Sequence, residues 1–216
     1  MTARREDGHL VVWYIHSAAG GPGVGSYIRP YELAKRWSDH GVEAVVVCPG
    51  FHHLMEGPAR SGPQVIDGVR YFFTRGLRYA GNGMSRILAM FQLMAMVVLQ
   101  ARSIAAFAGR PDIVIASSPH PFGLVSALIL RWIYGARVIF EVRDIWPASI
   151  LELTDATSKN PFIWLLTQLE KLAMRRSDAV VSLLEHSLPH MQARGLDPQR
   201  FHWIPNGVAG DGKDTP

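Results

Sequence analysis

Short apolar runs alternate along this 216-residue chain with segments of helical periodicity. Most of the apolar runs are rich in Val and Ile and end at Gly, Pro, Ser or a charged residue, as strands do. The pattern predicts strands at 10–15, 43–48, 69–74, 112–116, 137–142, 179–182 and 201–204. It predicts helices near 27–40, 84–107, 122–134, 161–176 and 185–194.

Local cues mark several helix ends. Gly41 and Gly135 stand where a glycine follows the last helical turn, and Asn160-Pro161 joins an N-cap to a first-turn proline. Strands and helices that alternate with short connections form right-handed βαβ units. The predicted fold class is therefore α/β, a Rossmann-like doubly wound parallel sheet. It takes up residues 9–207, and the polar residues 208–216 are expected to be a flexible linker or tail.

Composition narrows the function classes. The chain is 48% hydrophobic, enough for a full core, and its net charge of +4 is not gathered into a dense basic tract, so we expect no nucleic-acid partner. Cys48 is the only cysteine, which excludes an intrachain disulfide and a Cys-based zinc site. We expect Cys48 to be a buried strand residue and the compartment to be cytoplasmic.

Residues 138–147, VIFEVRDIWP, carry the strongest signal for a site. A buried parallel strand should be almost entirely apolar, yet this one ends in Glu141, Arg143 and Asp144. Ligands of open α/β sheets bind beyond the carboxyl ends of the strands. The alternative is an ion pair that only closes a loop.

Two more loops follow predicted strands at the same edge of the sheet. Gly20, Gly21, Gly23 and Gly25 crowd the first one, which suits backbone N–H groups near an anion, and Arg29 follows them. The spacing is neither that of a dinucleotide-binding loop nor that of a phosphate loop, which argues against a nicotinamide-dependent oxidoreductase. The alternatives are a flexible turn and a surface arginine.

The second loop places His120 between two prolines. Its restricted backbone suits a hydrogen bond to a sugar hydroxyl or a phosphate, although a lone loop histidine is more often structural. No acidic residue lies at metal-ligand spacing from His16, His52 or His53, so we expect no metal and no cofactor.

The segment 84–107 is almost continuously apolar and rich in methionine. It falls short of the roughly 20 apolar residues that a spanning helix needs. The two interpretations are a core helix packed on the sheet and an adaptable surface for a lipid tail or a membrane.

The motifs together resemble a known family. They are GGPGVGSYIRPYELAKRW, SSPHPFGL, FEVRDIWPASI, LEKLAMRRSDAVVSL and IPNGV, in this order. Over residues 9–208 the chain resembles the N-terminal, acceptor-side domain of retaining GT-B glycosyltransferases of family 4. The branch that it most resembles is that of the L-fucosamine transferases of surface polysaccharide synthesis.

This resemblance implies roles for individual residues. Gly20 and Gly21 would approach the donor phosphates, and His120 would contact the transferred sugar. Arg143, Asp144 and Trp146 would lie at the cleft, with Asp144 orienting an acceptor hydroxyl. Arg29 and Asn206 complete the expected substrate-binding set, and no metal is needed.

The resemblance also implies a reaction: transfer of a sugar from a nucleotide-sugar to a lipid-linked saccharide, by a cytoplasmic enzyme on the inner face of the plasma membrane. The family's C-terminal donor-binding domain is absent from the chain, so we expect these residues alone to transfer no sugar. Two alternatives stay open. One is the membrane-docking acceptor subunit of a split glycosyltransferase, and the other is a Rossmann-like binding module without catalysis.

Overall fold

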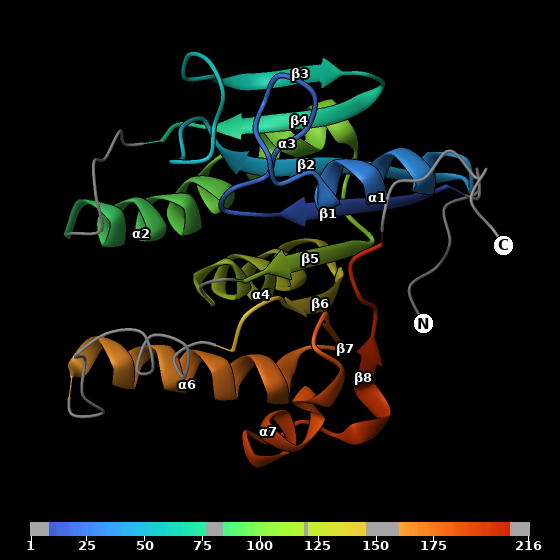
Figure 1. The fold of residues 1–216 in the computed structure, drawn as a ribbon. Helices are drawn as coiled ribbons and strands as arrows, with labels where there is room; N and C mark the ends of the chain where they lie inside the picture. The colour runs from blue at the N-terminus through green and yellow to red at the C-terminus, as the bar shows by residue number, and fades with distance from the viewer. Residues whose placement is uncertain (1–8, 77–83, 119–120, 146–159, 208–216) are drawn as a thin grey trace, which may run out of the picture.

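A computed structural model describes residues 9–76, 84–118, 121–145 and 160–207. Its centre is one sheet with the strand order β3-β4-β2-β1-β5-β6-β7-β8 (Figure 1). The strands are β1 (Leu10–Ile15), β2 (Val42–Pro49), β3 (Gly62–Ile66), β4 (Val69–Thr74), β5 (Ile113–Ser117), β6 (Arg137–Val142), β7 (Ala179–Ser182) and β8 (Phe201–Trp203). Every neighbouring pair is parallel except β3 and β4, which confirms the predicted α/β sheet.

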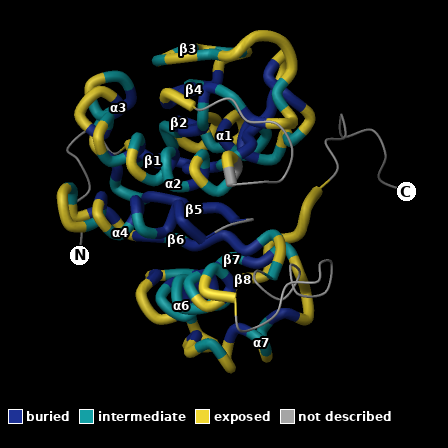
Figure 2. Tube along the Cα trace, turned by 90° about the vertical axis from the view of Figure 1, so that its left-hand side faces the viewer, coloured by how far each residue is buried: buried dark blue, intermediate teal, exposed yellow. Residues whose placement is uncertain are grey.

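Helices cover both faces of the sheet, as a doubly wound fold requires. They are α1 (Arg29–Ser38), α2 (Met84–Leu99), α3 (Ala101–Ala108), α4 (Phe122–Tyr134), α6 (Pro161–Arg176) and α7 (Leu188–Ala193), with short 3₁₀ turns at Glu185–Ser187 and Pro198–Arg200. Figure 2 shows α1 on the opposite side of the sheet from α3 and α4, with β5 and β6 buried between them. Alternate residues of β1 explain this division: Trp13 packs into the core under α2, α3 and α4, whereas Tyr14 packs beside Trp37 of α1.

Three predicted elements differ from the structure. The β3 strand was not predicted, because its sequence GPQVI has a proline and little apolar character; it pairs antiparallel at the edge, where such residues are tolerated. The single helix predicted at 84–107 is two helices, α2 and α3, bent by 61° near Gln100. The last predicted helix begins as a 3₁₀ turn because His186 has non-helical torsion angles.

The apolar helix α2 is largely a core helix. Met90, Leu93 and Val97 are buried, and Met90 packs with Phe122 of α4 and Leu166 of α6. Within the described ranges, no single helix is long and apolar enough to span a membrane, and only the bent α2–α3 pair reaches that length and composition when its halves are combined. A test of membrane contact therefore needs an exposed position of α2 in place of the buried Met90.

Candidate functional site

The carboxyl ends of β1, β5 and β6 lie at one edge of the sheet, toward which their arrowheads point in Figure 1. Ser118, just after β5, donates its backbone N–H to Glu141 O (2.9 Å). Its hydroxyl accepts the backbone N–H of Arg143 at 2.8 Å. These bonds hold the beginning of the two predicted loops together. His120, Trp146 and Pro147 lie outside the described residues.

Glu141 is a buried carboxylate at the centre of this edge. It accepts hydrogen bonds from the Tyr14 hydroxyl (2.5 Å), the Ser117 hydroxyl (2.6 Å) and Arg29 Nε (3.0 Å). Burial, followed by the charge of Glu141, raises the pKa of Tyr14 well above its ordinary value. The charge at the end of β6 is therefore a buried ion pair, the structural alternative that the sequence left open for this strand.

Arg29 and Asn206, two of the predicted substrate-binding residues, lie next to each other, and Arg29 is bonded to other parts of the protein. Besides Glu141, Arg29 donates to Pro205 O (2.9 Å), Ile204 O (3.1 Å) and Asn206 Oδ1 (3.3 Å). These contacts engage every nitrogen of the guanidinium. A pocket of about 280 Å³ opens beside them, lined in part by Ser26, Tyr27 and Asn206. Binding of a ligand phosphate by Arg29 stays a prediction, and it would require displacement of some of these bonds.

Arg143 is held in a stack with two aromatic rings. Its guanidinium carbon lies 3.4 Å from the centre of the Tyr27 ring, and its Nη1 lies 2.7 Å from His16 Nε2. His16 stacks on Tyr27 with ring centroids 4.6 Å apart. Burial raises the pKa of Tyr27 to about 12, although the charge of Arg143 acts in the opposite direction.

Two polar atoms of this stack are buried without a hydrogen-bond partner among the described residues: the Tyr27 hydroxyl and Arg143 Nε. Such a group costs about 1–3 kcal/mol when it stays unsatisfied. Native structures tolerate it mainly where water or a ligand completes the bonding. The sequence singled out Arg143, but no spacing or composition pointed to Tyr27 as its partner.

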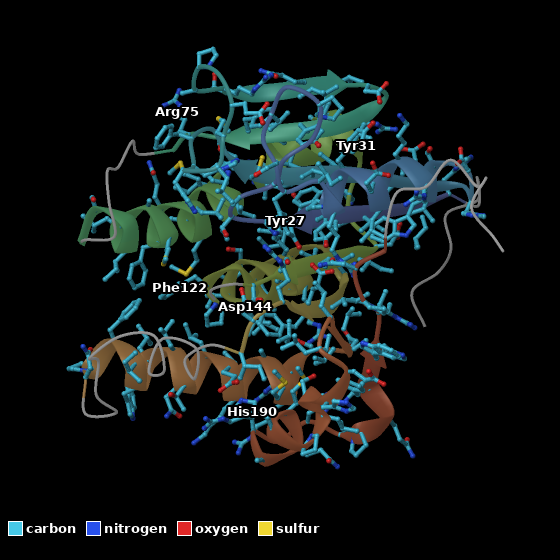
Figure 3. All side chains as sticks on the ribbon, in the orientation of Figure 1. Tyr27, Tyr31, Arg75, Phe122, Asp144 and His190 are labelled. Atoms are coloured by element: carbon cyan, nitrogen blue, oxygen red, sulfur yellow. The ribbon has the colours of Figure 1, made fainter. Side chains whose placement is uncertain are left out.

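Asp144 is exposed beside this stack, and Figure 3 shows it on the same edge as Tyr27 and Phe122. Its backbone N–H lies 3.4 Å from the Ser118 hydroxyl. This position is compatible with the predicted contact to an acceptor hydroxyl, which stays a prediction.

The glycine loop differs from the expected open anion cradle. Gly20 N–H donates to Tyr27 O (2.7 Å) and Gly21 N–H donates to Gly25 O (3.0 Å), so neither points at a ligand. The Tyr71 hydroxyl donates to Gly20 O at 2.7 Å, and His52 Nε2 lies 3.0 Å from Ala19 O. The loop is thus a closed turn clamped from β4 and from the segment after β2. The proposed approach of Gly20 and Gly21 to donor phosphates would need another loop conformation.

The structure offers no chemical role for the single cysteine or for a metal among the described residues. Cys48 is buried in β2, as predicted. Among the described residues, no group of three or more His, Cys, Asp or Glu side chains is arranged to hold a metal ion.

Similar solved structures identify the fold. Sucrose-phosphate synthase from Thermosynechococcus elongatus superposes with a TM-score of 0.69 at 10% identity, over 93% of this chain and 49% of that one. The catalytic domain of starch synthase IV from Arabidopsis thaliana, bound to ADP and acarbose, gives 0.56 at 14% identity over 93% and 52%. HepE from Anabaena, in complex with UDP-glucose, gives 0.51 at 17% identity over 93% and 44%. These likenesses show the fold, one Rossmann-like half of a GT-B glycosyltransferase, and this chain spans about half of each neighbour.

The sequence itself matches a family model. The model of the glycosyl transferase 4-like domain matches residues 23–207, and the chain belongs to that family. No curated protein matches the chain.

Proposed function

We propose that this domain is the acceptor-side half of a glycosyltransferase that moves a sugar from a nucleotide-sugar, with retention of configuration, to a lipid-linked saccharide. The setting is surface polysaccharide synthesis on the cytoplasmic face of the plasma membrane, in the manner of the L-fucosamine transferases. The observation that carries the proposal is the polar edge of β1, β5 and β6 within a family 4-like domain. Support for a nucleotide-sugar donor comes from HepE, whose structure contains UDP-glucose.

The roles of the residues follow from their surroundings. Arg143 is positively charged, held by His16 and Tyr27, and retains a buried N–H without a partner, so it binds the negative diphosphate that substrates of this class carry. Asp144, exposed beside it, accepts a hydrogen bond from the acceptor hydroxyl. For His120 and Trp146, which lie outside the described residues, the proposed roles are those that the family resemblance implies: a contact to the transferred sugar and a place at the cleft. Ser118 and Glu141 stabilise the strand ends beneath these residues, Ser118 by bonding the backbone of Arg143 and Glu141 by accepting from Ser117.

The test is a transfer assay with a complete enzyme in which this domain is joined to a donor-binding domain. Radiolabelled UDP-glucose and UDP-N-acetylglucosamine would be incubated with membranes that contain polyprenyl-diphosphate saccharides. Transfer moves label into the butanol-extractable lipid fraction, and an Asp144→Asn variant should lose most of that label. Label that reaches only free sugar or protein, with every donor, would contradict the proposal. These 216 residues alone should move no label.

The lipid part of the proposal has a separate test. Leu88, near the start of α2 and at the site edge of the sheet, is 53% exposed. We expect Leu88→Glu to reduce flotation of the protein with vesicles of phosphatidylglycerol. Leu99→Glu, at the far end of the same helix where Leu99 is 72% exposed, is the matched control and should float like the unchanged chain. Equal flotation of the chain and both variants would remove α2 from the lipid contact.

A further inference from the structure

A small hollow lies directly below Asp144. Its volume is about 10 Å³, and its walls are Ser118, Pro121, Phe140, Val142, Asp144, Glu170 and Met174. This volume is close to the smallest that holds one water molecule. A water also needs polar partners, and Ser118, Asp144 and Glu170 provide them in an otherwise apolar wall.

Glu170 is the unusual member of this wall. It lies on α6, its side chain is only 6% exposed, and its Oε1 lies 2.8 Å from His190 Nε2. Its Oε2 lies 3.0 Å from Arg194 Nε, yet it accepts no hydrogen bond from any described residue. Arg194 balances the charge of this oxygen, but a buried carboxylate oxygen also accepts hydrogen bonds, and the hollow that Glu170 lines has room for one donor.

Several charged or titratable groups lie near Glu170. Asp144, in the wall of the same hollow, is exposed, and the His190 side chain on α7, which contacts Glu170, is 28% exposed. Figure 3 shows Asp144 above His190 in the view, and Glu170 contacts both the hollow and His190. Arg194, directly after α7, and Lys171 of α6 are the other charges acting on Glu170. Burial raises the pKa of Glu170 in spite of these cations.

We propose that one water molecule occupies this hollow and donates its two hydrogens to Glu170 Oε2 and to the Asp144 carboxylate, which makes Glu170 a positioning residue for Asp144. The water fixes the side chain of Asp144 from below, and the exposed carboxylate oxygen is turned to the acceptor. The catalytic use of Asp144 rests on the proposed function; the water link does not.

The link can be measured in this chain without any sugar transfer, by NMR titration of its ¹³C-labelled side-chain carboxyls. Asp144→Asn is a surface change that does not threaten the fold, and it should lower the pKa of Glu170 because a neighbouring negative charge is removed. Glu185→Gln, which changes an exposed carboxyl before α7, is the control and should leave the pKa of Glu170 where it is.

The water itself has a direct signature. A long-lived buried water should give a nuclear Overhauser effect to the methyl groups of Val142, which line the hollow. A lower pKa of Glu170 in Asp144→Asn together with this signal supports the proposal. An unchanged pKa of Glu170 in that variant, or no water signal at Val142, would overturn it.

The positioning role is then tested in the complete enzyme. Glu170→Gln should lower kcat by about tenfold and leave the KM for the nucleotide-sugar unchanged, because only the orientation of the acceptor group is lost. An unchanged kcat would overturn the role of Glu170. Loss of the glycosyltransferase proposal would show differently, as a complete protein that transfers no sugar at all.

Discussion

The glycine loop and the loop after β6 both follow the carboxyl ends of parallel strands, but they differ in whether their polar groups find hydrogen-bond partners within the protein. The glycine loop satisfies its own backbone through Gly20 and Gly21 and is clamped by Tyr71 and His52. Beside the loop after β6, Arg143 Nε and the Tyr27 hydroxyl are buried and have no hydrogen-bond partner within the part of the chain that the structure describes. Glycines here indicate a close approach of backbone to backbone, whereas the unsatisfied donors indicate where a ligand is expected.

The largest expected effect concerns the steric need for glycine. A Cβ at Gly20 would lie 2.2 Å from Gly25 O and 2.6 Å from Tyr27 N, both of them backbone atoms. Gly20→Ala should therefore destabilise the fold by about 3 kcal/mol or more in urea unfolding. Gly207→Ala, where a Cβ would meet nothing within 4 Å, is the control and should change stability by less than about 0.5 kcal/mol. Similar unfolding curves for the two variants would break the contrast between the loops.

The next effect lies beneath the β6 loop. Glu141→Gln removes the charge that faces the nearly buried Arg29, whose side chain is 10% exposed. A buried cation without its partner costs about 3 kcal/mol. Urea unfolding at neutral pH should show this loss, and Glu43→Gln, in a half-exposed pair with Arg70, should show less than about 1 kcal/mol. Equal losses of stability in the two variants would mean that the buried ion pair of Glu141 contributes no more than an exposed one.

The pH dependence of stability tests the contact between His52 and the glycine loop. Burial lowers the pKa of His52 to about 4, below the ordinary value of 6.5. Between about pH 6.5 and pH 4, His52 is therefore protonated in the unfolded chain and neutral in the folded chain. The free energy of unfolding is at its full value above about pH 6.5 and decreases as the pH falls toward 4. The loss should reach about 3 kcal/mol. His52→Gln, which can still donate to Ala19 O, should flatten that part of the stability curve; an unchanged slope would exclude His52 as its source.

The smallest effect compares two hydroxyls directly. Tyr71→Phe removes the bond to Gly20 O and should cost about 1 kcal/mol of stability. Tyr27→Phe removes a buried hydroxyl without a partner, so stability should stay constant or rise, while substrate binding by the complete enzyme weakens. Thermal unfolding measures the first quantity and the KM the second. A loss of stability in Tyr27→Phe as large as in Tyr71→Phe would remove Tyr27 from the ligand-facing set.

The positions of the elements were largely predictable because periodicity and end signals are local. Gly135 adopts the left-handed conformation after α4, and the Asn160 side chain caps α6 by accepting from Phe162 N, both at the positions expected. The bend at Gln100 was not predictable, since no proline or glycine marks it and the packing of α2 on α4 and of α3 on β2 decides it.

The site was predictable only in part. Arg143 and Asp144 stood out because charges at the end of an apolar strand need a reason. Tyr27, Glu170 and His190 gave no such signal, because an aromatic residue or a glutamate in a helical segment is ordinary until its neighbours are known. The contacts join residues that are far apart in the chain: Arg143 lies against His16, and Glu170 lies against His190.

By itself, the sequence determined the α/β class, the family resemblance and the strand ends at which charged residues are found, because the alternation of elements, the turn residues and the charges after apolar runs are local features. Only the tertiary structure decided which of those charges are neutralised by partners within the protein. Glu141 and Arg29 neutralise each other, and Gly20 and Gly21 bond within their own loop. Arg143, Tyr27 and Glu170 keep unsatisfied atoms. The reason is that satisfaction of a polar group depends on partners from distant strands and helices, which meet only when the sheet is assembled.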